Sequence, residues 1–243
     1  MSRRLSLLVC WCLFAAGCAR APLWPVPFLH GGKTPVILTP LFREPFDELD
    51  PSRWKTVDLT GTTSYTIERQ DGESRLKADS QAGASILLTE VRFDPDKFEW
   101  LSWRWRVDRL VEREDLASKE GSDASARVYV YFNTPGLLPW QKRAMQYVWS
   151  ATLPVGTIVT SPYPGHPKML VVESGAEHLG MWRAVSRNLE DDYERCYGGR
   201  PPKVVAIGIM TDSDNTKSEA VAYYDDVHVT RASPLTPSDL DLP

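Results

Sequence analysis

The feature that most limits the fold of this chain is a series of short segments in which apolar and polar residues alternate. LSWRWRVD at residues 101–108 has an apolar side chain at every second position, and ARVYVYFN at 126–133 repeats the pattern. Successive side chains of a β-strand point to opposite faces, so this period of two indicates strands with one buried face. Trp103 and Trp105 fall on the apolar face, and we assign them to the core.

Further segments are rich in residues that favour strands. Four are strong candidates, QYVWSATL, KMLVVES, VVAIGIM and AVAYYDDVHVT, and three are weaker, SYTIER, SRLKADS and SILLTEVRF. Many short strands separated by Gly, Pro and Asp are typical of sandwiches. We therefore predict a mainly β domain over residues 41–232, an antiparallel β-sandwich of the jelly-roll type with one or two short helices.

Two segments have helical features. One lies near LLPWQKRA, and the other is NLEDDYERCYGG at residues 188–199. In the second, Asn188 is a candidate N-cap and two glycines follow the last turn. Tyr193 and Cys196 recur on one face with helical spacing. We therefore expect Cys196 to be a buried core thiol, not a nucleophile.

The first eighteen residues, MSRRLSLLVCWCLFAAGC, have the layout of a secretory signal. A positive start precedes an apolar run that is too short to span a bilayer, and small residues come directly before Cys18. The segment resembles a bacterial lipoprotein signal, which implies removal of residues 1–17 and acylation of Cys18 by fatty-acid chains such as palmitate. The alternative is an ordinary cleaved signal followed by a chance cysteine.

The segments at both ends of the predicted domain are rich in proline. Residues 18–40 contain five prolines, which favour an extended chain, and we expect a tether between a membrane and the domain. Residues 233–243 are Pro-rich and acidic, and we expect a loose tail. Ala19 follows the cysteine, where an Asp would signal inner-membrane retention. We therefore expect attachment to the outer membrane, with the domain facing the periplasm.

Charge and cysteine content exclude several classes of function. The chain has 28 basic and 32 acidic residues, and two of the basic ones belong to the signal. Such a chain has no global attraction for nucleic acid, and we predict no nucleic-acid partner. Cys10 and Cys12 leave with the signal and Cys18 is acylated, so Cys196 has no partner for a disulfide. The histidines are not spaced like the ligands of a metal site. The sequence leaves the oligomeric state open.

The polar faces of the two alternating strands form the first candidate site. Tyrosine rings stack on sugar faces, and arginine forks pair with carboxylates or sulfates. The hypothesis is a concave glycan site, with an acidic sugar among the candidate ligands. The alternative is a solvated outer face on which Arg–Tyr pairs stabilise the sheet. The candidate ligand-binding residues are Arg104, Arg106, Arg127, Tyr129, Tyr131 and Asn133.

The second candidate site is TDSDNT at residues 211–216. Calcium takes six to eight oxygen ligands, but this segment lacks the Gly and Glu of an EF-hand. We predict no required cofactor and at most a structural calcium ion; the alternative is a turn capped by its own side chains. Alternation places Asp225 inward with Val227 and Val229, where a carboxylate needs a cation, an Arg or backbone N–H groups. The candidate calcium ligands are Asp212, Asp214, Asn215 and Asp225.

A third hypothesis is acid–base catalysis. Asp123 lies near the start of one strand and Glu173 near the end of another, and paired carboxylates hydrolyse glycosides at a suitable separation. Arg127 and Tyr129 would assist such a reaction. The alternative, which we favour, is that these are ordinary surface acids, so we assign no catalytic residue.

Long segments of the chain resemble the bacterial domain of unknown function 3047, a family of exported proteins without an assigned activity. The resemblance covers Phe42 to Arg231 and rests on LSWRWRVD, ARVYVYFN, QYVWSATLPVGT, LGMWRAVSRNLEDDYERCYG and GIMTDSDNTKSEAVAYYDDV. YYDDVHV also resembles the last strand of carbohydrate-binding jelly-roll modules. We therefore expect a lipid-anchored periplasmic module that binds a carbohydrate or another cell-envelope ligand. The alternatives are a hydrolase or lyase that acts on polysaccharide, and a scaffold that binds another envelope protein.

Overall fold

The computed structural model describes residues 39–134 and 143–232. The predictions for the signal, for Cys18, for nearly all of the tether and for the tail concern residues outside these ranges. The helix expected near LLPWQKRA also falls almost wholly outside them. Among the described residues, no helix has the length and apolar composition that crossing a membrane requires.

One group of strands forms a six-stranded sheet. Its order is β11-β6-β13-β4-β3, and β1 pairs with β13 beside this path. All its pairs are antiparallel. The strands are β1 (Phe42–Glu44), β3 (Thr63–Gln70), β4 (Glu73–Gln81), β6 (Trp100–Arg109), β11 (Arg183–Asn188) and β13 (Glu219–Thr230).

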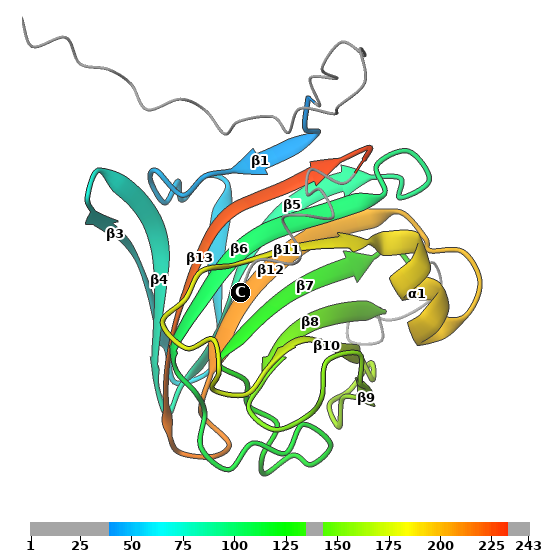
Figure 1. The fold of residues 1–243 in the computed structure, drawn as a ribbon. Helices are drawn as coiled ribbons and strands as arrows, with labels where there is room; N and C mark the ends of the chain where they lie inside the picture. Colours follow the sequence, from blue (N-terminus) through cyan, green and yellow to red (C-terminus); the bar gives the residue numbers. More distant parts are fainter. Residues whose placement is uncertain (1–38, 135–142, 233–243) are drawn as a thin grey trace, which may run out of the picture. The chain divides into compact units, whose positions relative to one another are not determined.

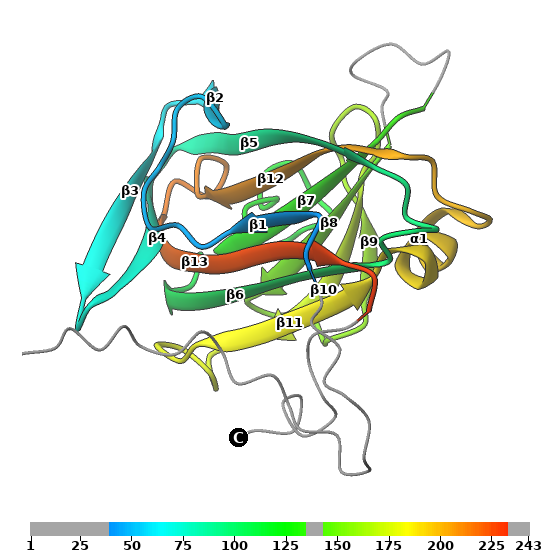
Figure 2. The ribbon, with the colours of Figure 1, turned by 90° about the horizontal axis from the view of Figure 1, so that it is seen from above.

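The other strands form a seven-stranded sheet in the order β2-β5-β12-β7-β8-β10-β9. Its pairs are antiparallel except that of β8 and β10, which run parallel. The strands are β2 (Trp54–Thr60), β5 (Ala84–Phe93), β7 (Ala126–Phe132), β8 (Ala144–Ser150), β9 (Ile158–Thr160), β10 (Lys168–Ser174) and β12 (Val204–Asp212). Residues of both sheets share one core, so the sheets pack face to face as a β-sandwich (Figures 1 and 2).

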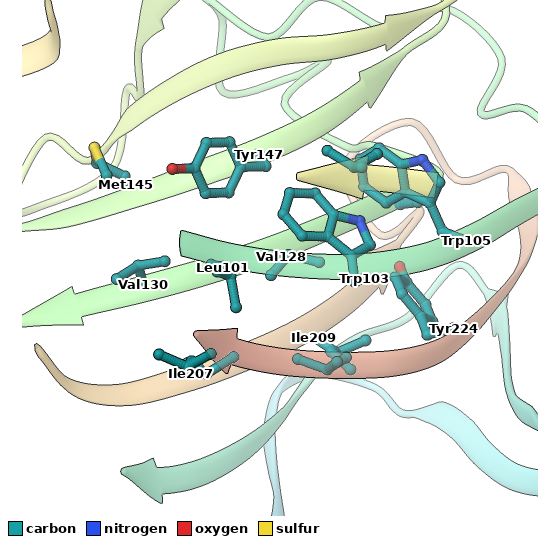
Figure 3. Close-up of a cluster of buried hydrophobic side chains, with 14 of the residues drawn as sticks. Leu101, Trp103, Trp105, Val128, Val130, Met145, Tyr147, Ile207, Ile209 and Tyr224 are labelled. Carbon is teal, nitrogen blue, oxygen red and sulfur yellow. The ribbon is translucent and has the colours of Figure 1, made fainter. Parts of the chain in front are cut away.

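Aromatic side chains hold the two sheets together. Trp103 of β6 lies 5.2 Å from Tyr147 of β8 between ring centroids, and Trp105 lies 6.0 Å from Trp149. Figure 3 shows Trp103 and Trp105 among apolar side chains of the opposite sheet, such as Val128. Aromatic side chains bury about 150–250 Å² each, so these rings contribute much of the burial between the sheets. The assignment of both tryptophans to the core is confirmed.

The single helix of the described residues is α1 (Leu189–Tyr197). The side chain of Asn188 accepts hydrogen bonds from two backbone N–H groups of the first turn, and Gly198 at φ 74° ends the helix. Cys196 is buried and unpaired, and burial raises its pKa to about 11. The predicted cap, helix and buried thiol are confirmed, since a thiol with a raised pKa is a poor nucleophile at neutral pH.

Candidate functional site

The structure does not bring the six residues of the predicted polar face together. β6 belongs to the six-stranded sheet and β7 to the seven-stranded sheet. The apolar residues of both strands fill the core between the sheets, so the polar residues point away from the core on opposite sides of the sandwich. The expectation of one shared face is therefore wrong. Arg104 and Arg106 lie on one outer face, and Arg127, Tyr129 and Tyr131 lie on the other.

On the outer face of the six-stranded sheet, the two arginines interact with neighbouring side chains. The guanidinium of Arg106 lies 4.1 Å from the ring centroid of Tyr223, and that of Arg104 lies 5.0 Å from the ring of Trp182. Arg106 also pairs with Asp108 at 2.8 Å between Nε and Oδ1. The Arg106–Tyr223 contact is a cross-strand pair, and such pairs stabilise a sheet, which agrees with the alternative interpretation of this face.

Asp225 also lies on this outer face, because a β-bulge interrupts β13. The register with β6 shifts between Asp225 and His228, and Asp226 has a positive φ of 47°. The prediction that Asp225 shares a face with Val227 is therefore wrong. Asp225 does have the partners that it was expected to need, since it accepts a hydrogen bond from the N–H of Asp226 at 2.8 Å and pairs with Arg104 at 3.5 Å.

The outer face of the seven-stranded sheet has a cavity of about 170 Å³. Its wall combines residues of β2, β5, β7, β8 and β12 with the loops before β7, between β9 and β10, and after β12. The residues that matter most below are Arg127, Tyr129, Gln146, Tyr163, Asp212 and Asp214. Tyr131 stacks on Tyr129 with 5.6 Å between ring centroids and 10° between planes. Asn133 lies elsewhere, in the wall of a second cavity of about 330 Å³ with Lys97 and Lys203.

Arg127 is the most heavily hydrogen-bonded side chain of the cavity. Its Nε and Nη2 donate to the two carboxylate oxygens of Asp212 at 3.0 and 3.1 Å. Nη2 also donates to the carbonyl of Ser122 at 2.7 Å, and Nη1 donates to Gln146 at 2.7 Å and to the sulfur of Met169 at 3.5 Å. A guanidinium has five N–H groups, so each has a protein acceptor. Burial lowers the pKa of Arg127, but Asp212 together with Tyr129, Asp123 and Glu114 outweighs this effect and raises it.

Three buried carboxyl groups meet beside this arginine. One oxygen each of Asp123, Asp212 and Asp214 lies within 4.8 Å of the others. Asp123 accepts hydrogen bonds from the backbone N–H of Asn215 and from the N–H and hydroxyl of Thr216, at 3.2, 2.7 and 2.7 Å. The turn at residues 211–216 is thus capped in part by an acid from another loop. Alternation and motif spacing give no sign of this contact.

The remaining predicted residues of the turn have different surroundings. Burial and the neighbouring Asp123 raise the pKa of Asp214. The amide oxygen of Asn215 accepts a hydrogen bond from the hydroxyl of Tyr163 at 2.9 Å. Asp225 belongs to the six-stranded sheet, so it does not lie beside Asp212 and Asp214. The third acid of the group is Asp123 instead.

The sequence of this domain matches the model of a known family. The family is described as a protein of unknown function, DUF3047, and the match covers residues 52–228. The chain belongs to the DUF3047 family. Every residue of the cavity on the seven-stranded sheet lies inside the matched range, so this site belongs to the DUF3047 domain itself. No curated protein matches the sequence.

Several solved structures resemble this DUF3047 domain at low identity. The family 11 carbohydrate-binding module of a cellulosomal cellulase of Clostridium thermocellum has a TM-score of 0.45 and 10% identity, covering 80% of this chain and 95% of that one. The xyloglucanase domain of NopAA from Sinorhizobium fredii has a TM-score of 0.44 and 7% identity, with 76% and 96% covered. At these values the likeness concerns the β-sandwich and no individual residue of the site.

Proposed function

We propose that this protein is a non-catalytic binding module that holds a carbohydrate at the outer face of its seven-stranded sheet. In this proposal, a lipid on Cys18 anchors the module to the outer membrane, and the domain works in the periplasm. The observation that carries the proposal is the pair of stacked rings, Tyr129 and Tyr131, beside a cavity with amide and hydroxyl groups.

This combination suits a sugar ring, which has an apolar face of C–H groups and a rim of hydroxyls. Aromatic rings provide the apolar contact, while Gln146 of β8 and Tyr163 of the loop between β9 and β10 provide polar groups. The cavity of about 170 Å³ is smaller than the roughly 300–1,000 Å³ of sites that enclose drug-sized ligands. We therefore propose that one sugar ring enters the cavity and that the rest of the ligand lies along the sheet.

The charges of the cavity favour a neutral or amino sugar over an acidic one. Arg127 directs all its N–H groups to protein acceptors, so a ligand carboxylate would have to displace one of them. Arg127 balances the charge of Asp212, whereas Asp214 adds negative charge to the wall of the cation-free cavity. An anionic sugar would meet these carboxylates without a free arginine to balance its own charge.

The test is a screen of the full chain, purified in detergent, against neutral, amino and acidic glycans. For a glycan that the wild type binds, we expect Tyr131→Ala to weaken binding about five- to 150-fold, because stacking of a nucleic-acid base on an aromatic ring is worth about 1–3 kcal/mol and a sugar ring also presents an apolar face. Tyr223→Ala is the matched control, since Tyr223 lies on the opposite outer face. Calorimetry gives both dissociation constants.

Two results would contradict this placement. Equal binding by Tyr131→Ala and wild type would remove the stacked pair from the site, and loss of binding in Tyr223→Ala alone would move the site to the six-stranded sheet. The same samples are assayed for newly released reducing ends. Release by the wild type would favour the hydrolase alternative over a binding module.

A further inference from the structure

The three carboxyl groups beside the cavity leave negative charge without a partner. Asp123, Asp212 and Asp214 are 0, 3 and 8% exposed. Arg127 forms an ion pair with Asp212, whereas neither of the other two acids forms one with any residue in the ranges 39–134 and 143–232. One oxygen of Asp214 also lies within 4.8 Å of an oxygen of Asp123, which is a close contact between two acids. Because ionised carboxylates only accept hydrogen bonds, such a contact needs a proton or a cation between them.

A second observation, in the wall of the same cavity, also points to a ligand. Ser122 lies next to Asp123 in the chain, is 1% exposed and lines the cavity. Its hydroxyl oxygen has no hydrogen-bond partner among the described residues. Buried hydroxyl groups nearly always have a partner, so this oxygen lacks a neighbour that a bound species would supply.

We propose that Asp123, Asp212, Asp214 and the Ser122 hydroxyl bind a divalent cation, with Ca²⁺ the best fit. All four ligands are hard oxygens, and no thiol or imidazole is among them, which favours Ca²⁺ or Mg²⁺ over zinc or copper. The two carboxylates without an ion pair match a charge of two. The site differs from the set expected from sequence, because it takes Asp123 and omits Asn215 and Asp225.

Geometry and burial favour calcium over magnesium. Calcium binds oxygen at about 2.3–2.6 Å, so ligands on opposite sides of the ion are about 5 Å apart. Carboxylate oxygens within 4.8 Å of one another fit such a sphere. Magnesium binds at about 2.0–2.1 Å and keeps several waters, which suits a closed, buried group of acids poorly. The ion would join the loop before β7 to the end of β12 and the turn after it, and so fix one wall of the cavity.

The experiment uses the full chain in detergent, stripped with EDTA and dialysed. Thermal unfolding is followed while Ca²⁺ or Mg²⁺ is added, and Tb³⁺ luminescence reports binding directly, because Tyr129 and Tyr163 line the cavity and can sensitise the ion. We expect a hundredfold excess of Ca²⁺ over its dissociation constant to raise Tm by roughly 5–10 °C, and Mg²⁺ to have a smaller effect.

Two variants and one control make the result specific. Asp214→Asn should lose the calcium shift and yet be at least as stable as the wild type without calcium, because it removes one of three like charges. Ser122→Ala, which changes no charge, should weaken Tb³⁺ binding and keep the fold. Asp226→Asn is the control, since it removes a carboxyl from a pair of neighbouring acids on the other sheet; it should keep the full calcium shift.

The proposal is overturned if millimolar Ca²⁺ changes neither Tm nor Tb³⁺ luminescence of the wild type; the acids then hold protons instead. It is also overturned if Asp214→Asn and Asp226→Asn respond to calcium alike. None of these measurements uses a sugar, so a failure of the cation site can be told apart from a failure of glycan binding.

Discussion

Arg127 illustrates how a side chain on the polar face of a strand can serve the fold. Its guanidinium joins β12 through Asp212, β8 through Gln146 and the loop before β7 through the carbonyl of Ser122. Because all its donors are engaged, the arginine positions the wall of the cavity and has no N–H group left for a ligand. An arginine side chain is well suited to recognise an anion, but the N–H groups of Arg127 are already bound to protein acceptors.

We expect Arg127→Ala to lower the free energy of unfolding by about 3–5 kcal/mol, because it leaves the carboxylate of Asp212 buried without its cation. Urea denaturation measures this loss as a lower midpoint. Arg43→Ala is the control, since its pair with Asp226 involves a side chain that is 45% exposed and should be worth about 0–1 kcal/mol. Equal losses in the two variants would show that Arg127 does not hold the wall.

At the residue scale, local patterns predicted burial well and contacts poorly. The positions of Trp103 and Cys196 follow from periodicities of two and 3.6, which depend on neighbours within a few residues. The contact of Asp123 with Thr216 joins residues 93 positions apart, and no period encodes it. The candidate site could therefore be predicted only in part: Asp212 and Asp214 were proposed from their spacing, whereas Asp123 needed the fold.

Among the elements, β13 shows how one irregularity changes the outcome of a correct strand prediction. The segment AVAYYDDVHVT is a strand, but its bulge places both Asp225 and Asp226 between the inward-facing Tyr224 and Val227. A bulge adds one residue to one strand of a pair and reverses the alternation beyond it. Strict alternation therefore assigned Asp225 to the wrong face.

The bulge has a consequence for stability that depends on pH. Burial and Asp226 raise the pKa of Asp225 to about 7, although Arg104 opposes them; Glu73 adds a smaller effect in the same direction as Asp226. The unfolded chain has an ordinary pKa near 3.8, so the folded protein binds more protons between about pH 4 and 7. The contribution of Asp225 to the free energy of unfolding should therefore fall by up to about 4 kcal/mol as pH rises through this range.

Asp225→Asn tests this effect, because the amide does not titrate. Its stability relative to the wild type should rise between pH 4 and 7, measured by urea denaturation at several pH values. Asp79→Asn, on the neighbouring strand β4, should keep the wild-type dependence. A constant difference between Asp225→Asn and wild type across this range would contradict the raised pKa.

Sheet membership was beyond what the strand pattern could predict. All nine strand candidates are strands, and the sandwich class is confirmed. Four strands were missed: β1 and β9 have three residues each, β2 is exposed apart from Trp54, and β11 pairs only at an edge. Alternation shows which residues share a face of one strand, but pairing between distant strands decides which faces meet. For this reason the arginines of β6 and β7 lie on opposite faces.

At the scale of the whole molecule, the proposed lipid anchor would decide where the proposed binding face works. We expect Cys18→Ser to abolish labelling by radioactive palmitate and to move the protein from the membrane fraction to the soluble periplasmic fraction of a bacterial host, because the acyl chains hold it at the bilayer. Immunoblots of the fractions measure this. Cys196→Ser is the control and should keep both label and location. Labelling that persists in Cys18→Ser would place the lipid elsewhere or replace it by another anchor.

The parallel strands β8 and β10 are joined by a connection whose sequence can change more freely than that of the core strands. A strand that returns parallel to its neighbour needs a crossover, here residues 151–167, and Ser161 and Tyr163 of this crossover form part of the cavity wall. This connection holds none of the buried apolar residues of the described ranges, and its contribution to the core is limited to partly buried side chains such as Ile158 of β9. Substitutions or insertions in the crossover could therefore reshape the cavity, and retarget the module to a new ligand, while the sandwich stays intact.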